Sequence, residues 1–180
     1  MIAVFLAFDR FLMRWTARAA MTFLVLAVAV SFYQVVTRFV FEQPSTWSEV
    51  TARALDIWMV YLGIAIAFRG GTMMAVDFLL DRTRGGARLV LLALIAGLTI
   101  GVLGVLVWSG VMMVQRTQFQ MLAGIDNPFT GEGIPIALVY AAIPTGAALA
   151  IVGVIARAIE SARETLAGAA VASDRTILEV

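Results

Sequence analysis

The sequence contains no cysteine, no histidine and no lysine, and charged residues make up only 14% of its 180 residues. Without cysteine and histidine there is no disulfide, no thiolate or imidazole metal ligand, and no Ser-His or Cys-His catalytic pair. A site built only from carboxylates stays possible. The net charge of +1 is too small to indicate nucleic-acid binding. An enzyme is therefore the weakest interpretation.

Apolar residues, in contrast, are in large excess and make up 62% of the chain. Soluble domains have about 45–50% apolar and roughly 25% charged residues. A chain of this length cannot bury that much apolar surface in water, so we expect lipid to be its solvent. The predicted fold class is all-α, an integral membrane four-helix bundle preceded by an N-terminal interfacial helix over residues 1–15.

Membrane spans are predicted where long segments are almost free of charge, because about 20 helical residues cross the hydrocarbon core. The expected spans cover residues 19–41, 49–69, 89–115 and 133–156 of a single membrane domain, 1–165, followed by a flexible cytoplasmic tail, 166–180. Span two is the hardest to place, because its uncharged core, 57–68, is too short. We extend it backward, since Pro44 ends the preceding helix and Thr46 to Glu49 resembles a capping box.

Orientation is predicted from the arginines in the short loops, because basic residues gather on the cytoplasmic side of a membrane. Ten of the 13 arginines fall on one side of the four spans, and Arg38, Arg53 and Arg116 fall on the other. Both termini are therefore expected in the cytoplasm.

Span two begins with charged residues at helical spacing. Glu49, Arg53 and Asp56 share one face, either as an interfacial ion-pair ladder or as a polar contact with a partner protein. Arg38 and Glu42 are spaced for a similar pair. Trp47 is expected in the interfacial aromatic belt.

Two other features are candidates for structural roles. Gly97 and Gly101 form a G-x-x-x-G pattern that allows close helix approach, although such matches are frequent by chance. Arg69 to Asp77 reads as a tight basic turn rather than a phosphate-binding loop, because no G-K-[ST] follows. Pro144 lies inside span four and is expected to kink it.

The expected spans carry no ionisable residue in their middle, and no internal repeat is visible. A proton relay, an ion pathway or a charged substrate site would need such residues, and an inverted-repeat carrier would need the repeat. We therefore expect that this chain neither transports nor catalyses alone.

An ordered set of short motifs extends over all four spans. These are Arg38-Phe39-Val40-Phe41, Trp47-Ser48-Glu49, Ala52-Arg53, Tyr61-Leu62-Gly63, Ala67-Phe68-Arg69, Val76-Asp77-Phe78-Leu79, Gly133-Ile134-Pro135, Val139-Tyr140 and Ile143-Pro144. In this set the chain resembles the small, DctQ-type membrane subunit of tripartite ATP-independent periplasmic (TRAP) transporters. It departs from the family at Val50, often acidic there, and at Met73, often histidine.

The resemblance implies a bacterial inner-membrane transporter of three parts. A periplasmic substrate-binding protein delivers an organic acid, and a large membrane subunit holds the sodium and substrate sites. The small subunit is then a static scaffold that packs against the large one and helps the binding protein dock. It needs no cofactor of its own. The alternative is a free-standing channel or carrier that works as a homo-oligomer, which would require a polar stripe through one span.

Overall fold

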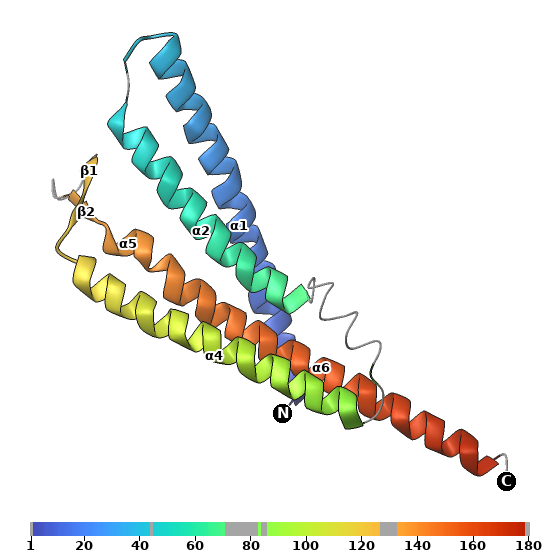
Figure 1. The fold of residues 1–180 in the computed structure, drawn as a ribbon. Coiled ribbons are helices and arrows are strands. Elements are labelled where there is room, and N and C mark those ends of the chain that lie inside the picture. The colour runs from blue at the N-terminus through green and yellow to red at the C-terminus, as the bar shows by residue number, and fades with distance from the viewer. Residues whose placement is uncertain (1, 44, 71–82, 84–85, 127–132, 179–180) are drawn as a thin grey trace.

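The computed structural model describes residues 2–43, 45–70, 83, 86–126 and 133–178, and most of them are helical (Figure 1). The elements in chain order are α1 (Ile2–Phe39), α2 (Thr46–Gly70), α4 (Gly86–Thr117), β1 (Met121–Asp126), β2 (Gly133–Pro135), α5 (Ala137–Tyr140) and α6 (Ala142–Leu178). Four helical segments in this part of the chain are long and apolar enough to cross a membrane. The predicted all-α membrane bundle is confirmed.

The first helix differs from the prediction at both ends. We expected an interfacial helix over residues 1–15 before span one, but α1 is one continuous helix of 38 residues. It ends at Phe39, and Glu42 has a left-handed backbone with φ of 54°. A non-glycine residue in that region does not continue a helix. The guanidinium of Arg38 lies 5.7 Å from the Phe39 ring centroid.

The second helix extends backward, over the charged residues, as we argued from Pro44. It begins at Thr46. The polar contacts at this start involve Ser45 and Ser48, whose hydroxyls contact each other, and Ser48 also donates to the Ser45 carbonyl at 3.0 Å. Thr46 and Glu49 do not form the expected box, because Glu49 instead pairs with Arg53.

Span four was predicted to begin at Gly133, and this start is wrong. Residues Gly133–Pro135 form β2, which pairs antiparallel with β1. The following helix is interrupted at Ala141, between α5 and α6. Pro144 explains the break, since it lacks the N–H that a continuous helix would bond to the carbonyl four residues earlier, and it fits within the first turn of α6. At the other end, α6 continues to Leu178, where we expected a flexible tail from residue 166.

The helices form two antiparallel pairs, α1 with α2 and α4 with α6, joined because α2 also packs on α6. Figure 1 shows the pairs close together at the end where α2 stops, and splayed apart at the other end. The hydrophobic core follows the α4–α6 and α2–α6 contacts: Ala65, Leu103, Ala147, Ala150 and Val154. Its small residues let the backbones of α2 and α6 approach closely.

Glycines make the closest helix contacts, but not the glycines that the sequence suggested. A Cβ on Gly146 of α6 would lie 2.7 Å from the Tyr61 carbonyl oxygen, and one on Gly110 would lie 2.7 Å from Pro144 Cδ. Gly97 and Gly101 have no atom of another element within 4 Å of such a Cβ, and both are exposed. Their G-x-x-x-G pattern therefore makes no close helix contact within the described part of the chain.

Candidate functional site

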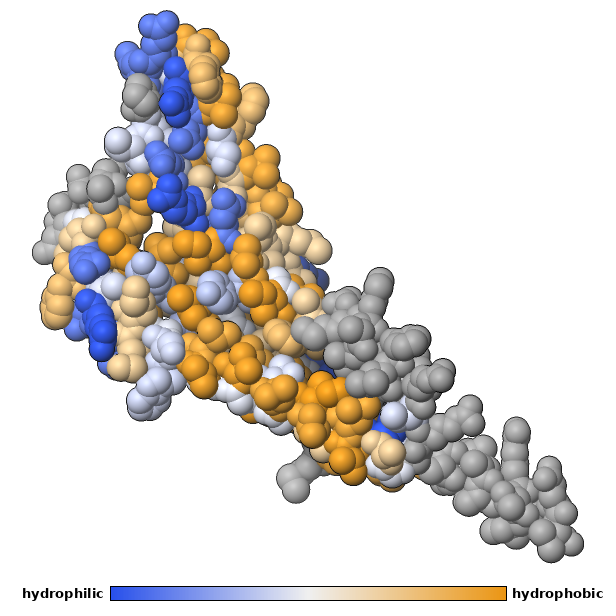
Figure 2. Space-filling model, in the orientation of Figure 1, coloured by the Kyte–Doolittle hydropathy of each residue, from blue (hydrophilic) through white to orange (hydrophobic). Residues whose placement is uncertain are grey.

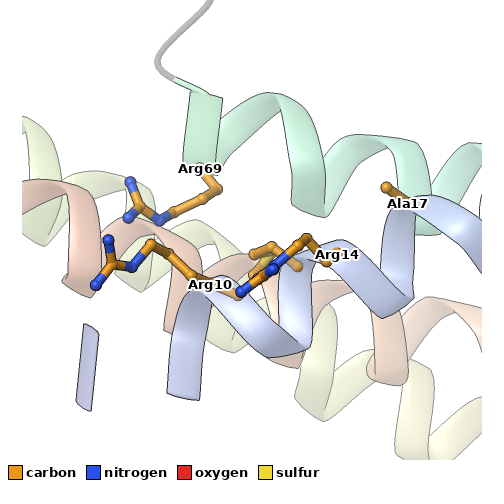
Figure 3. A pocket seen from close by; sticks show the side chains of 5 residues that line it. Arg10, Arg14, Ala17 and Arg69 are labelled. Carbon is orange, nitrogen blue, oxygen red and sulfur yellow. The ribbon is translucent and has the colours of Figure 1, made fainter. Parts of the chain in front are cut away.

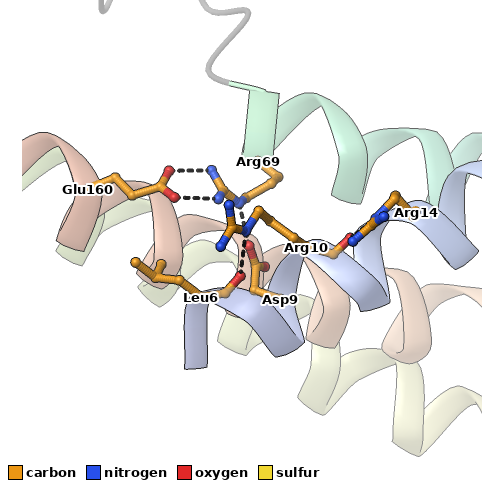
Figure 4. Close-up of polar contacts among 6 residues, drawn as sticks. All are labelled: Leu6, Asp9, Arg10, Arg14, Arg69 and Glu160. Atoms are coloured by element: carbon orange, nitrogen blue, oxygen red, sulfur yellow. Dashed lines mark hydrogen bonds and ion pairs between the residues drawn. The ribbon is translucent and has the colours of Figure 1, made fainter. Parts of the chain in front are cut away.

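Three helices meet at a cluster of ionised side chains at the end where the helix pairs converge (Figure 4). Arg69, at the end of α2, donates from Nε to Asp9 Oδ2 on α1 at 2.5 Å. Its two terminal nitrogens donate to both carboxylate oxygens of Glu160 on α6, at 2.8 and 2.9 Å. This second interaction is the bidentate geometry that matches a guanidinium to a carboxylate.

The cluster is shielded from solvent, and most strongly at Asp9. The side chain of Asp9 is 0% exposed, that of Arg69 is 16% exposed and that of Glu160 is 34% exposed. Gly153 allows this packing, because a Cβ there would lie 3.0 Å from the Cβ of Arg69. Asp9 Oδ1 has no hydrogen-bond partner among the described residues. Within this part of the chain, the negative charge of Asp9 is therefore compensated through the bond from Arg69 to Oδ2.

The arrangement is suited to holding helices together rather than to chemistry. Arg69 cannot be deprotonated in a protein, so it remains a cation beside both carboxylates and cannot act as a proton donor or acceptor. The three partners are separated by 60 and 91 residues in sequence. The pair with Asp9 therefore holds α1, and the pair with Glu160 holds α6, against the last turn of α2.

Sequence reasoning selected Arg69 but missed both of its partners. Asp9 was assigned to an interfacial helix, and Glu160 was placed after the last expected span, which ended at residue 156, although both lie on the side where most arginines were counted. The available signal was Asp9 itself, a single carboxylate that follows eight residues without charge. Because the cluster is at the helix ends, it does not place an ionisable residue in the middle of a span.

The charged face of α2 is, in contrast, open to the surroundings. Glu49 and Arg53 form an ion pair at 3.0 Å with side chains 60% and 71% exposed, and Asp56 is exposed on the same helix. The Trp47 ring packs against Tyr33 at a centroid distance of 5.4 Å. Figure 2 shows hydrophilic residues gathered over this splayed end of the α1–α2 pair, above a mostly apolar middle.

The remaining predicted residues do not join either charged region. Gly97 and Gly101 are exposed on α4, and Arg38 is exposed near the end of α1. Asp77, the end of the predicted turn, lies outside the described residues. One further link crosses between the helix pairs: the indole of Trp58 on α2 donates to the carbonyl of Leu138 on α5 at 3.1 Å.

Comparison with known proteins gives this architecture a family. The family model for the DctQ component of tripartite ATP-independent periplasmic transporters matches residues 27–164, from within α1 to within α6. The chain belongs to this family. It is also 32% identical, over 118 residues, to the sialic acid TRAP transporter small permease protein SiaQ of Vibrio cholerae serotype O1. The aligned region covers 63% of this chain and 66% of that protein.

Membership of the DctQ family makes this chain a small TRAP transporter subunit in a membrane, and so a transport component rather than an enzyme. The family match includes Arg69 and Glu160, but it begins after Asp9. The cluster therefore joins a residue outside the matched region to two residues inside it.

Proposed function

We propose that this chain is the static scaffold subunit of a sodium-driven TRAP transporter for organic acids. It packs against a large membrane subunit that holds the sodium and substrate sites, and it helps a periplasmic substrate-binding protein dock. Both termini face the cytoplasm of a bacterial cell, with the chain in the inner membrane.

The observation that carries this proposal is the one-sided packing of the outer helices. Only 6% of the most apolar stretch of α4 and 11% of that of α1 are buried within the chain. The exposed Gly97 and Gly101 leave a flat strip on α4 that a partner helix can approach closely. A large membrane subunit packed on one of these faces accounts for the exposure, while lipid covers the rest.

The distribution of charge supports a passive role. Within the helices that the structure describes, the paired and shielded carboxylates are at one end, and the ladder of Glu49, Arg53 and Asp56 is at the other. A carrier that moves ions needs polar or ionisable groups near the middle of the membrane. We assign the ladder to contact with the large subunit, and the β1–β2 hairpin, also at the end opposite the cluster, to docking of the binding protein.

The substrate class rests on a relative. The printed name of the Vibrio cholerae protein assigns it to a sialic acid transporter, and sialic acid is an organic acid. We extend the class, but not the individual substrate, to this chain, because the substrate and sodium sites belong to the large subunit in this proposal.

The orientation is tested with reporter fusions. A fusion after Val180 is expected to report the cytoplasm, and one inserted within residues 123–132 is expected to report the periplasm. Ten arginines against three on the two sides motivate this result. The same compartment for both fusions contradicts a four-span arrangement.

The scaffold role is tested by reconstitution into liposomes with a sodium gradient and candidate organic acids. This chain alone should show no uptake, the large subunit alone little, and the pair with its binding protein strong sodium-dependent uptake. Uptake by the large subunit at the full rate without this chain contradicts the proposal. Flux through this chain alone would instead favour the homo-oligomeric channel.

A further inference from the structure

A pocket of about 380 Å³ lies beside the ion cluster, between α1 and the end of α2 (Figure 3). Its lining combines the guanidinium-bearing side chains of Arg10, Arg14 and Arg69 with the apolar side chains of Met13 and Ala17. Pockets for small molecules begin at about 300 Å³. The volume is therefore sufficient for a phosphate headgroup and the first carbons of an attached chain.

Among the described residues, no carboxylate pairs with Arg10 or Arg14 beside this pocket. Arg10 and Arg14 each donate a hydrogen bond from Nε to a carbonyl of their own helix, at 3.3 and 3.2 Å. These bonds leave the terminal nitrogens available, and no ion pair with a carboxylate is formed by either residue among the parts of the chain described. Asp9 and Glu160, the two carboxylates of the cluster beside the pocket, are already bound to Arg69.

The position of these cations in the helix makes the imbalance more costly. Arg10, Arg14 and Arg18 are spaced by four residues, so they are neighbours on one helix face and repel one another. An external anion would relieve this repulsion.

Two features place the pocket at the level of lipid headgroups. Trp15 is exposed, and Arg18 lies over its ring, 5.2 Å from the centroid. Exposed tryptophans gather where the apolar core of the membrane meets water. Beyond them α1 becomes free of charge from Ala19 to Thr37, as a helix in the hydrocarbon does. The arginines thus lie at headgroup depth, and Met13 and Ala17 supply apolar surface beside them.

We propose that this pocket binds an anionic phospholipid, with its phosphate held by Arg10 and Arg14 and the start of one acyl chain against Met13 and Ala17. Phospholipids supply phosphates at this depth, and basic pockets between helices on the cytoplasmic side bind the headgroups of the anionic ones, whose charge is not offset by a cationic group. Arg69 has five N–H groups and uses three on its two carboxylates, so it adds a donor at the edge of the pocket. The bound lipid would hold α1 in place beside the cluster.

The test measures lipid binding by the full-length chain in a neutral detergent, and needs no partner subunit. Native mass spectrometry and a fluorescence titration follow binding of phosphatidylglycerol, with phosphatidylcholine and inorganic phosphate as comparison probes. We expect saturable binding of phosphatidylglycerol and little binding of the other two. Equal binding of inorganic phosphate would show a site for free anions, and equal binding of phosphatidylcholine would show no preference for charge. Either result overturns the proposal.

The double variant R10Q/R14Q removes the two phosphate ligands. Each basic residue near an anionic lipid surface contributes a factor of about five in affinity, so binding should weaken by about thirty-fold. The matched control R38Q/R116Q removes the same charge from exposed arginines at the opposite end, and should bind as the wild type does. An equal loss in both variants would show that net charge, not this pocket, attracts the lipid.

A second variant keeps every charge and fills the pocket. Ala17→Phe adds an aromatic ring beside Met13 and should lower phosphatidylglycerol binding while leaving the arginines unchanged. Circular dichroism and gel filtration establish that each variant is folded. If R10Q/R14Q does not fold, Ala17→Phe decides the question, because undiminished binding by a folded variant with an occupied pocket rules out this site.

Discussion

The two ends of this molecule contain the same kinds of charged residue, arranged in opposite ways. At the convergent end Arg69 is 16% exposed and joins carboxylates from α1 and α6. At the splayed end Arg53 is 71% exposed and pairs with Glu49 of its own helix. The first arrangement connects segments that are distant in sequence. The second stabilises one turn of one helix and leaves its charges available to other molecules.

The difference shows that the contribution of an ion pair to stability depends on its burial, and that the number of ion pairs alone does not predict it. An exposed i,i+4 pair contributes a few tenths of a kcal/mol. A shielded pair is different, because removing one partner leaves an uncompensated charge. The convergent end is therefore where stability is expected to be sensitive, and the splayed end is where partner binding is expected to be sensitive.

The largest difference between the two ends should come from Arg69→Ala, which removes the cation that both Asp9 and Glu160 bind. We expect the free energy of unfolding to fall by about 3–5 kcal/mol, measured by reversible unfolding in mixed detergent micelles. Arg53→Ala is the control at the other end and should cost no more than about 1 kcal/mol. Equal losses in the two variants would remove the distinction between the ends.

A smaller effect is expected from adding one methyl group where α2 and α6 touch. Gly146→Ala places a Cβ 2.7 Å from the Tyr61 carbonyl oxygen, so the helices must separate, at a cost of about 1–3 kcal/mol. Gly101→Ala adds the same group to an open face of α4 and should change stability by less than about 0.5 kcal/mol. A thermal melt of both variants checks this ranking, which fails if Gly101→Ala is the more harmful.

The hydrogen bond from Trp58 to Leu138, which joins the helix pairs nearer the splayed end, should contribute less to stability than the two contacts above. Trp58→Phe keeps an aromatic ring against Phe23 but removes the N–H donated to the Leu138 carbonyl. One such hydrogen bond contributes about 1 kcal/mol. Trp108→Phe is the control, because Trp108 is exposed on α4. The two melting temperatures should differ by a few degrees, and identical values would show that the indole bond does not join the pairs.

The smallest effect on the chain itself, but a marked one on assembly, is expected from Arg53→Glu. It places three like charges on one face of α2, which costs a few tenths of a kcal/mol while the face is exposed and more once a partner desolvates it. Co-purification of the large subunit should therefore fall. Arg116→Glu makes the same charge change on α4. Unchanged co-purification and uptake with Arg53→Glu would indicate a ladder that faces lipid and water only.

The helices were predictable from sequence because each appears as a continuous segment with few charged residues, and such a segment can be recognised without knowing its neighbours in space. The backward extension of α2 followed from Pro44 and the polar residues after it, and the helix does start at Thr46. The start of the last span was not predictable in this way. Gly133–Pro135 is apolar enough for a span, but it pairs as a strand with β1, and hydropathy does not report pairing.

The contacts between helices were less predictable, since they depend on which faces meet. The G-x-x-x-G pattern pointed to Gly97 and Gly101, yet the close contacts are made by Gly110, Gly146 and Gly153. For the same reason the cluster could not be assembled from sequence. No spacing rule connects Asp9 to a residue 60 positions later, and only the packing of three helices brings their side chains together.

The cluster also has a consequence for the order in which this chain is made and inserted. Asp9 leaves the ribosome first, Arg69 follows, and Glu160 emerges only after α4 and the β1–β2 hairpin have been synthesised. During that interval Asp9 and Arg69 can pair with each other, but the bidentate contact with Glu160 has no counterpart. The closing of the convergent end is therefore a late step of biogenesis, and the last helix is the one that completes it.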